Sequence, residues 1–168
     1  MIHPTAVIGD PPESRDYWFD ESAPTWPPFI HPDARVHAFV SVDAGMKRST
    51  VVGKGTWLGK HVHVGHDAII GELCELAPGV VVCGHVEIGD GVRIGVNACI
   101  RPFVKVGALA RIGCGAVVIR DVLPGQVVAG NPAKPIVAKG QYVPPLDSVR
   151  EGWDELASAV GRRQEAFR

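Results

Sequence analysis

The sequence is poor in aromatic residues, cysteine and net charge, and each shortage excludes a class of protein. Phe, Trp and Tyr make up 7% of the chain, and 17 basic side chains nearly balance 18 acidic ones, for a formal net charge of -1. This balance argues against binding nucleic acid or a membrane surface by bulk electrostatics. The four cysteines form no C-x-x-C pair, which excludes zinc-knuckle and thioredoxin-like motifs.

The sequence also lacks a long uninterrupted apolar run. Its most apolar stretch, residues 99–119, is broken by Arg101, Lys105 and Arg111, so it does not predict a membrane span. The first residues have neither the basic nor the apolar region of a signal peptide. We therefore expect a cytoplasmic protein whose thiols stay reduced.

Glycine and proline, by contrast, are abundant. They number 20 and 14 among 168 residues, about one residue in five, which a helical bundle would not tolerate. Apolar residues make up 46% of the chain, enough to bury a core. The composition therefore favours one domain with many turns, built from β-structure or from a repeat.

Between residues 51 and 122 the chain is an unbroken six-residue repeat. Twelve hexads follow one another without insertion, and the third residue is glycine in eight of them. The sixth residue is small or β-branched in every hexad, from Thr56 to Val122. The second residue is always aliphatic: Val52, Leu58, Val64, Ile70, Leu76, Val82, Ile88, Ile94, Ile100, Val106, Ile112 and Val118.

A period of six matches neither the 3.6 residues of a helix nor the alternation of a long strand. It is typical of a short strand followed by a corner, with two inward-facing residues in each hexad. Three hexads would make one triangular coil of 18 residues, and successive coils would stack as parallel strands about 4.8 Å apart. The same pattern occurs earlier, at Ile2, Ile8, Ile30, Val36 and Val42. The sequence thus predicts an all-β parallel β-helix of about six triangular coils.

Two interruptions and a tail complete the expected organisation. Residues 10–28 leave the repeat and contain five prolines together with Trp18. A four-residue insertion, Lys47-Arg48-Ser49-Thr50, separates two registers, and insertions in solenoids form surface loops that often bind ligands. After Pro144-Pro145, apolar residues recur at intervals of three and four. We expect a β-helix domain at 1–143, with a loop excursion at 10–28, and a short amphipathic α-helix at 144–168.

The hexads, which end in Ala129-Gly130-Asn131-Pro132-Ala133-Lys134, resemble those of the hexapeptide-repeat acyltransferases. The resemblance covers residues 1 to about 136 and implies a left-handed β-helix that assembles as a homotrimer. The segment His63-Val64-Gly65-His66-Asp67, followed by Gly84-His85-Val86, is similar to two branches of this family. One is the UDP-N-acetylglucosamine O-acyltransferase of lipid A synthesis. The other comprises acetyltransferases of nucleotide-linked amino sugars and sialic acids.

The resemblance implies that His66 is the general base and that Asp67 supports it. Acyl transfer from a thioester needs a base for the acceptor proton, and imidazole has a suitable ordinary pKa. Both residues lie at a corner, where both side chains can point outward. His85 follows Asp67 by 18 residues, one full coil, so it should lie about 5 Å above it. We expect these three residues to form the catalytic cluster.

The resemblance also suggests residues for the two substrates. Val96 and Cys114 match donor-contacting positions of the acetyltransferases, Gly113 adjoins Cys114, and Lys134 is suited to a phosphate of the donor. The expected donor is acetyl-CoA or another acyl-CoA. The acceptor is a sugar-like small molecule, to which we assign His63 and, in the 10–28 excursion, Asp16 and Trp18.

Two other functions remain open at this stage. The same fold hosts γ-class carbonic anhydrases, but Gly71 stands where their Gly-His-x-x-x-x-His segment has its second zinc ligand. His61 and His66 would lie on successive corners about 16 Å apart, too far to share one zinc ion. We therefore expect no metal. The third function is a non-catalytic β-helix scaffold, which would bind no acyl donor.

Overall fold

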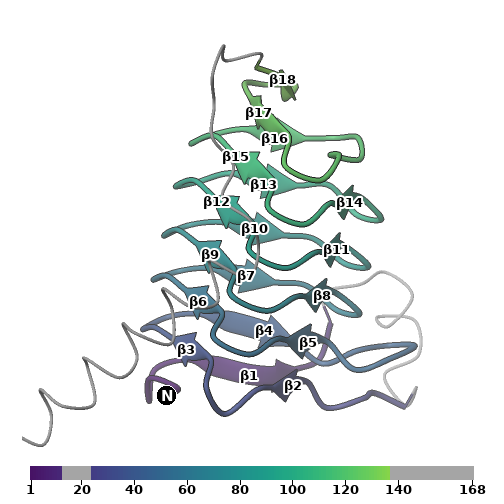
Figure 1. Cartoon of the computed structure of the whole chain (residues 1–168). Helices are drawn as coiled ribbons and strands as arrows, with labels where there is room; N and C mark the ends of the chain where they lie inside the picture. The colour runs from purple at the N-terminus through teal and green to yellow at the C-terminus, as the bar shows by residue number, and fades with distance from the viewer. Residues whose placement is uncertain (13–23, 137–168) are drawn as a thin grey trace, which may run out of the picture.

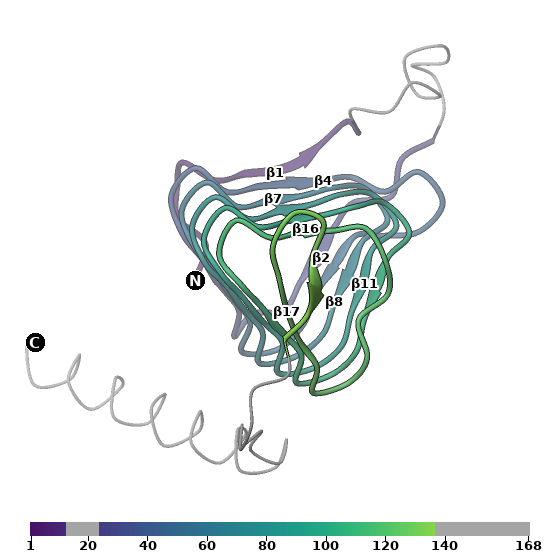
Figure 2. The same cartoon turned by 90° about the horizontal axis from the view of Figure 1, so that it is seen from above.

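The chain winds into a stack of triangular coils, seen from the side in Figure 1 and from above in Figure 2. The computed structural model describes residues 1–12 and 24–136. Each regular coil takes 18 residues and contributes one short strand to each of three parallel sheets, as the registers Val81↔Cys99 and Glu87↔Lys105 show. The predicted coil length is confirmed.

The three sheets form the three sides of the triangle, and from β1 to β16 each takes every third strand. The first sheet consists of β1 (Val7–Asp10), β4 (Ser41–Asp43), β7 (His63–Val64), β10 (Val81–Val82), β13 (Cys99–Ile100) and β16 (Val117–Val118). The second consists of β2 (Phe29–Ile30), β5 (Val51–Val52), β8 (Ile69–Ile70), β11 (Glu87–Ile88) and β14 (Lys105–Val106). The third consists of β3 (Arg35–Val36), β6 (Trp57–Leu58), β9 (Glu75–Leu76), β12 (Arg93–Ile94), β15 (Arg111–Ile112), β17 (Val127–Ala129) and β18 (Lys134–Pro135), the last of which runs antiparallel.

The core is the column enclosed by the three sheets. All twelve aliphatic residues at the second hexad position are buried, and so are all twelve residues at the sixth position. Two of the sixth-position residues are polar or weakly polar. The Thr56 hydroxyl donates to the Gly71 carbonyl at 2.7 Å and accepts from the Cys74 amide at 3.0 Å. The two inward rows predicted from the sequence are therefore confirmed.

The corners share one backbone conformation. The fifth residue of every hexad from 51–56 to 111–116 has a positive φ, between 55° and 74°. Glycine adopts this left-handed region freely, whereas other residues are strained there. The non-glycine residues at this position include Asp67 (φ 60°) and His85 (φ 61°). Two of the three predicted catalytic residues thus stand at the same point of successive coils.

The coils follow a left-handed path, as the resemblance implied (Figure 2). No helix that could cross a lipid bilayer occurs in residues 1–12 or 24–136. The expected amphipathic helix at 144–168, the boundary at residue 143 and most of the 10–28 excursion lie outside the described residues. They remain predictions.

Candidate active site

The predicted catalytic residues meet at one edge of the triangle, between the first and second sheets. We call this edge the His66 corner; it consists of residues 65–67, 83–85 and 101–103 in three successive coils. Its coils are joined by backbone hydrogen bonds, from the His85 amide to the His66 carbonyl (2.9 Å) and from the Phe103 amide to the Gly84 carbonyl (3.3 Å). The expected position of His85, one coil above Asp67, is confirmed.

His66 and Asp67 form a hydrogen-bonded pair. The His66 Nδ1 lies 2.8 Å from the Asp67 Oδ2. An ionised carboxylate can only accept hydrogen bonds, so Nδ1 carries the proton and Nε2 is left unprotonated in the neutral ring. The His66 side chain is 17% exposed and that of Asp67 is fully buried. The His66 side chain is therefore accessible to a bound molecule, whereas the Asp67 carboxylate is not.

The burial of Asp67 differs from the expectation that both side chains point outward. The insertion seen in the sequence covers the carboxylate, and the amides of Met46, Lys47 and Arg48 donate to its oxygens at 3.2, 2.7 and 2.8 Å. Burial alone would raise the pKa of Asp67. The hydrogen bonds from His66 and the three amides outweigh burial and lower that pKa below its ordinary value.

His85 completes the cluster. Its Nε2 lies 3.9 Å from the Asp67 Oδ2, and its ring meets the His66 ring edge-on, with centroids 4.9 Å apart. Burial lowers the pKa of His85; the Asp67 charge opposes this, and nearby positive charges add to it. His85 is therefore neutral at pH 7. Phe103 stacks on its ring at 4.6 Å and 9°, although the Phe103 residue is 70% exposed.

Gly84, one coil above, lies directly against the His66 ring. A Cβ atom at residue 84 would lie 2.6 Å from the His66 Nε2 and 2.8 Å from its Cε1. The absence of a side chain here therefore leaves the space that the imidazole occupies.

Of the predicted acceptor residues, the structure describes His63. It lies on β7, where its Nδ1 is 2.9 Å from the Ser41 hydroxyl and its Nε2 is 3.9 Å from a carboxylate oxygen of the buried Asp43. His63 belongs to the same coil as His66, on the face next to the corner. Asp16 and Trp18 lie outside the described residues.

The predicted donor residues gather on a different corner. Val96, 41% exposed, lies between β12 and β13, and the Gly115 amide one coil above bonds to its carbonyl at 2.8 Å. Cys114 is exposed there, and Gly113 bonds to Val128, beside the β17–β18 pair that contains Lys134. These four residues thus form one column, but a single chain does not bring them to His66.

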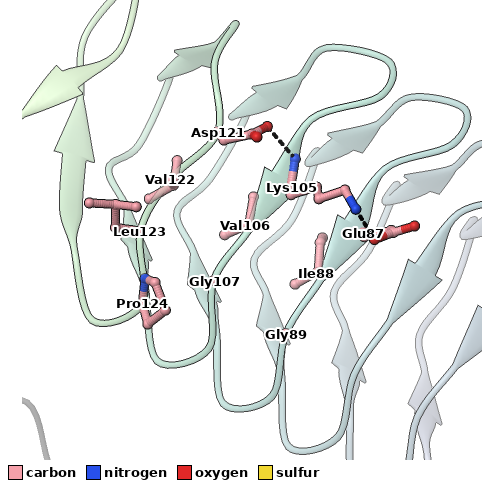
Figure 3. Close-up of a pocket in the computed structure, with 10 residues that line it drawn as sticks. All are labelled: Glu87, Ile88, Gly89, Lys105, Val106, Gly107, Asp121, Val122, Leu123 and Pro124. Carbon is pink, nitrogen blue, oxygen red and sulfur yellow. Dashed lines mark hydrogen bonds and ion pairs between the residues drawn. The ribbon is translucent and has the colours of Figure 1, made fainter.

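An open pocket of about 420 Å³ lies on the second sheet, at β11 and β14 and the turns that follow them. Figure 3 shows the Lys105 amine paired with Glu87, at 3.1 Å, and the Lys105 amide bonded to Asp121, at 2.8 Å. The residues lining the pocket are Glu87, Ile88, Gly89, Lys105, Val106, Gly107, Asp121, Val122, Leu123 and Pro124. His66 is not among them, so this pocket is not part of the cluster of His66, Asp67 and His85.

Within residues 1–12 and 24–136, His66, Asp67 and His85 also form a group that could hold a metal ion, because one ligand atom from each lies within 4.8 Å of the others. The carboxylate, however, already accepts three amide hydrogen bonds and the bond from His66. An ion ligated by His66 Nδ1 and Asp67 would have to displace the bond between them. The donor set fits a hydrogen-bonded pair better than a metal site.

Sequence reasoning did not assign the Met46–Arg48 amides, Gly84 or Phe103 to the site. Two signals point to them. Ser49, in the insertion, precedes Asp67 by 18 residues, and Phe103 follows His85 by 18. The coil length therefore places both segments beside the cluster.

Known proteins share the six-residue repeat and the fold of this chain. Residues 49–84 and 85–120 each match the model of the bacterial transferase hexapeptide with six repeats. The chain thus contains hexapeptide repeats of this kind over residues 49–120. It is 33% identical over 136 residues to the acyl-[acyl-carrier-protein]–UDP-N-acetylglucosamine O-acyltransferase of Nautilia profundicola, covering 79% of this chain and 51% of that protein.

Two solved structures are similar in fold. One is the UDP-N-acetylglucosamine O-acyltransferase of Moraxella catarrhalis, with a TM-score of 0.77 and 26% identity over 83% of this chain and 54% of that one. The other is the acetyltransferase domain of PglB from Neisseria gonorrhoeae in complex with acetyl coenzyme A, with a TM-score of 0.61 and 30% identity over 80% and 56%. The hexapeptide-repeat chain spans about half or less of the curated relatives it matches, 37% and 51% in two of them.

Proposed function

We propose that this hexapeptide-repeat protein is an acyltransferase that moves an acetyl group from acetyl-CoA to a hydroxyl or amine of a sugar or nucleotide-linked sugar. The observation that carries the proposal is the 2.8 Å bond between the His66 Nδ1 and the buried Asp67 carboxylate. It leaves the His66 Nε2 as a partly exposed base. The relatives support the reaction class, since their names describe acyl transfer to UDP-N-acetylglucosamine.

In the proposed reaction the His66 Nε2 accepts the proton of the acceptor hydroxyl or amine as that group attacks the thioester carbonyl. The new C–O or C–N bond forms, and the tetrahedral intermediate collapses with cleavage of the C–S bond. The imidazolium then returns its proton to the departing thiolate. Asp67 keeps Nδ1 protonated and stabilises the positive charge of the ring during this exchange.

His85 and His63 serve the acceptor in this proposal. A neutral imidazole both donates and accepts a hydrogen bond, so His85, beside His66, is suited to a sugar hydroxyl. His63 lies on the neighbouring face. Asp16 and Trp18 remain proposed acceptor residues, because an aromatic ring offers a flat surface for a sugar or base ring.

The donor is proposed to lie between two copies of the chain. Val96, Gly113, Cys114 and Lys134 would bind it from one subunit, while His66 of the next subunit faces the thioester. This arrangement requires an oligomer, and we propose the homotrimer. The cytoplasmic location expected from the sequence stays a prediction.

Replacement of His66 tests the function. Release of CoA from acetyl-CoA is measured with a panel of nucleotide-linked sugars, amino sugars among them. His66→Ala is expected to lower kcat by about 10²–10⁴, with acetyl-CoA binding near wild type. His31→Ala is the matched control, because His31 lies between β2 and β3, on the corner that carries neither the cluster nor the proposed donor residues, and its Nδ1 accepts from the Asp33 amide at 3.1 Å. Full activity of His66→Ala with the true acceptor would disprove the mechanism.

The two alternatives predict different outcomes of the same assay. A zinc enzyme would lose activity with a chelator and would contain stoichiometric zinc. This outcome is tested because ligand atoms of the cluster lie close together. If His66 is the base, a chelator should leave the activity unchanged. A scaffold would bind no acyl donor, so acetyl-CoA would then fail to protect the exposed Cys114 from alkylation.

A further inference from the structure

The loop Gly45–Thr50 contains the four-residue insertion and lies directly below the His66 corner. It joins β4 to β5, which pair with β7 and β8 of the coil that carries His66 and Asp67. The first residues of β7 and β8 are six residues apart, whereas those of β4 and β5 are ten apart. The higher coils turn the same corner without extra residues, so the turn itself does not need the insertion.

The loop surrounds the Asp67 carboxylate with backbone donors. Three consecutive amides point at it: those of Lys47 and Arg48 bond to Oδ1 at 2.7 and 2.8 Å, and that of Met46 bonds to Oδ2 at 3.2 Å. Successive amides turned the same way form an anion-binding concavity. Together with the bond from His66, they fix where each carboxylate oxygen lies.

The Arg48 side chain fastens this loop to the coils above it. Its Nε donates to the Asp67 carbonyl at 3.0 Å, and its terminal nitrogen lies 3.3 Å from the Glu87 carboxylate. Glu87 is held in turn by Lys105, the pair drawn in Figure 3. At the other end of the loop, the Thr50 hydroxyl accepts a hydrogen bond from the Asp67 amide at 3.0 Å. Arg48 touches neither ring of the catalytic cluster through any of these bonds.

We propose that Arg48 is a positioning residue: by fastening the Gly45–Thr50 loop it aims the Asp67 carboxylate at the His66 Nδ1 and fixes the tautomer whose Nε2 is free. Without the guanidinium the three amides lose their anchor and the carboxylate can rotate. The His66 ring then loses its fixed partner. In water an imidazole with no partner exchanges its proton between the two nitrogens, so the tautomer becomes mixed. The catalytic consequence rests on the proposed function, whereas the effect on the tautomer does not.

The test combines nuclear magnetic resonance with kinetics. Protein with ¹⁵N-labelled histidine reports the protonation of each ring nitrogen, and the His66 signals are assigned by their loss in His66→Ala. Arg48→Ala is expected to move His66 from one Nδ1-protonated tautomer toward a mixture. It should also lower kcat by up to about 10², with both KM values near wild type. Arg93→Ala is the matched control, since its guanidinium pairs with Glu75 at 3.5 Å on the third sheet.

A second pair of variants keeps the test decisive if Arg48→Ala does not fold. Glu87→Gln leaves the Nε bond to the Asp67 carbonyl in place, so it should cause a smaller shift in the same direction. Arg48→Lys should restore part of the wild-type tautomer. A wild-type His66 tautomer in both Arg48 variants, with unchanged kcat, would overturn the proposal. A shifted tautomer in a protein that transfers no acyl group in its wild-type form would instead reject the proposed function and leave the positioning role standing.

Discussion

The most informative single residue outside the catalytic cluster is Gly84. It occupies the fourth position of its hexad, and the other eleven hexads carry a side chain there: Lys54, Lys60, His66, Glu72, Pro78, Asp90, Val96, Pro102, Ala108, Cys114 and Arg120. Gly84 is not among the residues with positive φ, so the backbone does not require glycine. The requirement comes from the His66 ring, which fills the space of the missing Cβ.

Gly84→Ala should therefore impair the base without disturbing the coil. The new methyl group would lie 2.6 Å from the His66 Nε2 and push the ring out of place, which should lower kcat by about 10². Ala108 already stands at the same hexad position, so alanine is compatible with the fold there. Thermal unfolding and acyl transfer are measured together. A fully active variant would show that the ring tolerates the displacement.

At the scale of the hexad, two glycines serve different purposes. Gly115 lies at the fifth position with φ +64° and has no atom within 4 Å of its missing Cβ, so only the backbone conformation favours glycine there. Gly53 lies at the third position, where a Cβ would run into the Gly71 carbonyl of the next coil. A substitution at Gly115 therefore reports on backbone strain at the corner, and a substitution at Gly53 reports on the spacing between coils.

Gly115→Ala should accordingly cost about 1–2 kcal/mol in the free energy of unfolding, the usual penalty of a left-handed conformation. Gly53→Ala should cost more, because the clash is with backbone and the coils would have to move apart. Chemical denaturation of both variants measures the two free energies. Equal costs would contradict the assignment of the third-position glycines to coil contact.

At the scale of the whole molecule, the proposed site is incomplete in one chain. The His66 corner lies between the first and second sheets, while the proposed donor residues lie on or beside the corner between the third and first sheets. Two copies side by side can bring these corners together, and closed symmetry then favours a ring of identical contacts. This geometry calls for an oligomer, and the resemblance to the hexapeptide-repeat acyltransferases is the reason to expect a homotrimer.

Light scattering should therefore give a mass near three times the 17.9 kDa of the chain, at micromolar concentration and with acyl-transfer activity in the same fraction. Dilution below the dissociation range should lower activity and mass together, because each site would lose the subunit that holds the donor. An active species of 17.9 kDa would refute the shared site.

The sequence by itself determined the coil, its inward residues and the cluster of His66, Asp67 and His85. The reason is that a repeat of 18 residues turns distance along the chain into a neighbour relation: residues one coil apart in sequence lie about 5 Å apart in space. An aliphatic second position and a small sixth position are enough to identify which side chains face inward.

Only the tertiary structure decided how the cluster is supported. The 18-residue count places the Lys47–Thr50 insertion beside Asp67 but does not show where its amides point, and their direction is what holds the Asp67 carboxylate. The contact between Gly84 and the His66 ring and the stacking of Phe103 on His85 likewise depend on where Cβ vectors and rings of neighbouring coils meet. Such contacts depend on differences of less than an ångström in the distance between coils. A pattern of residue types carries no information on distances of that size.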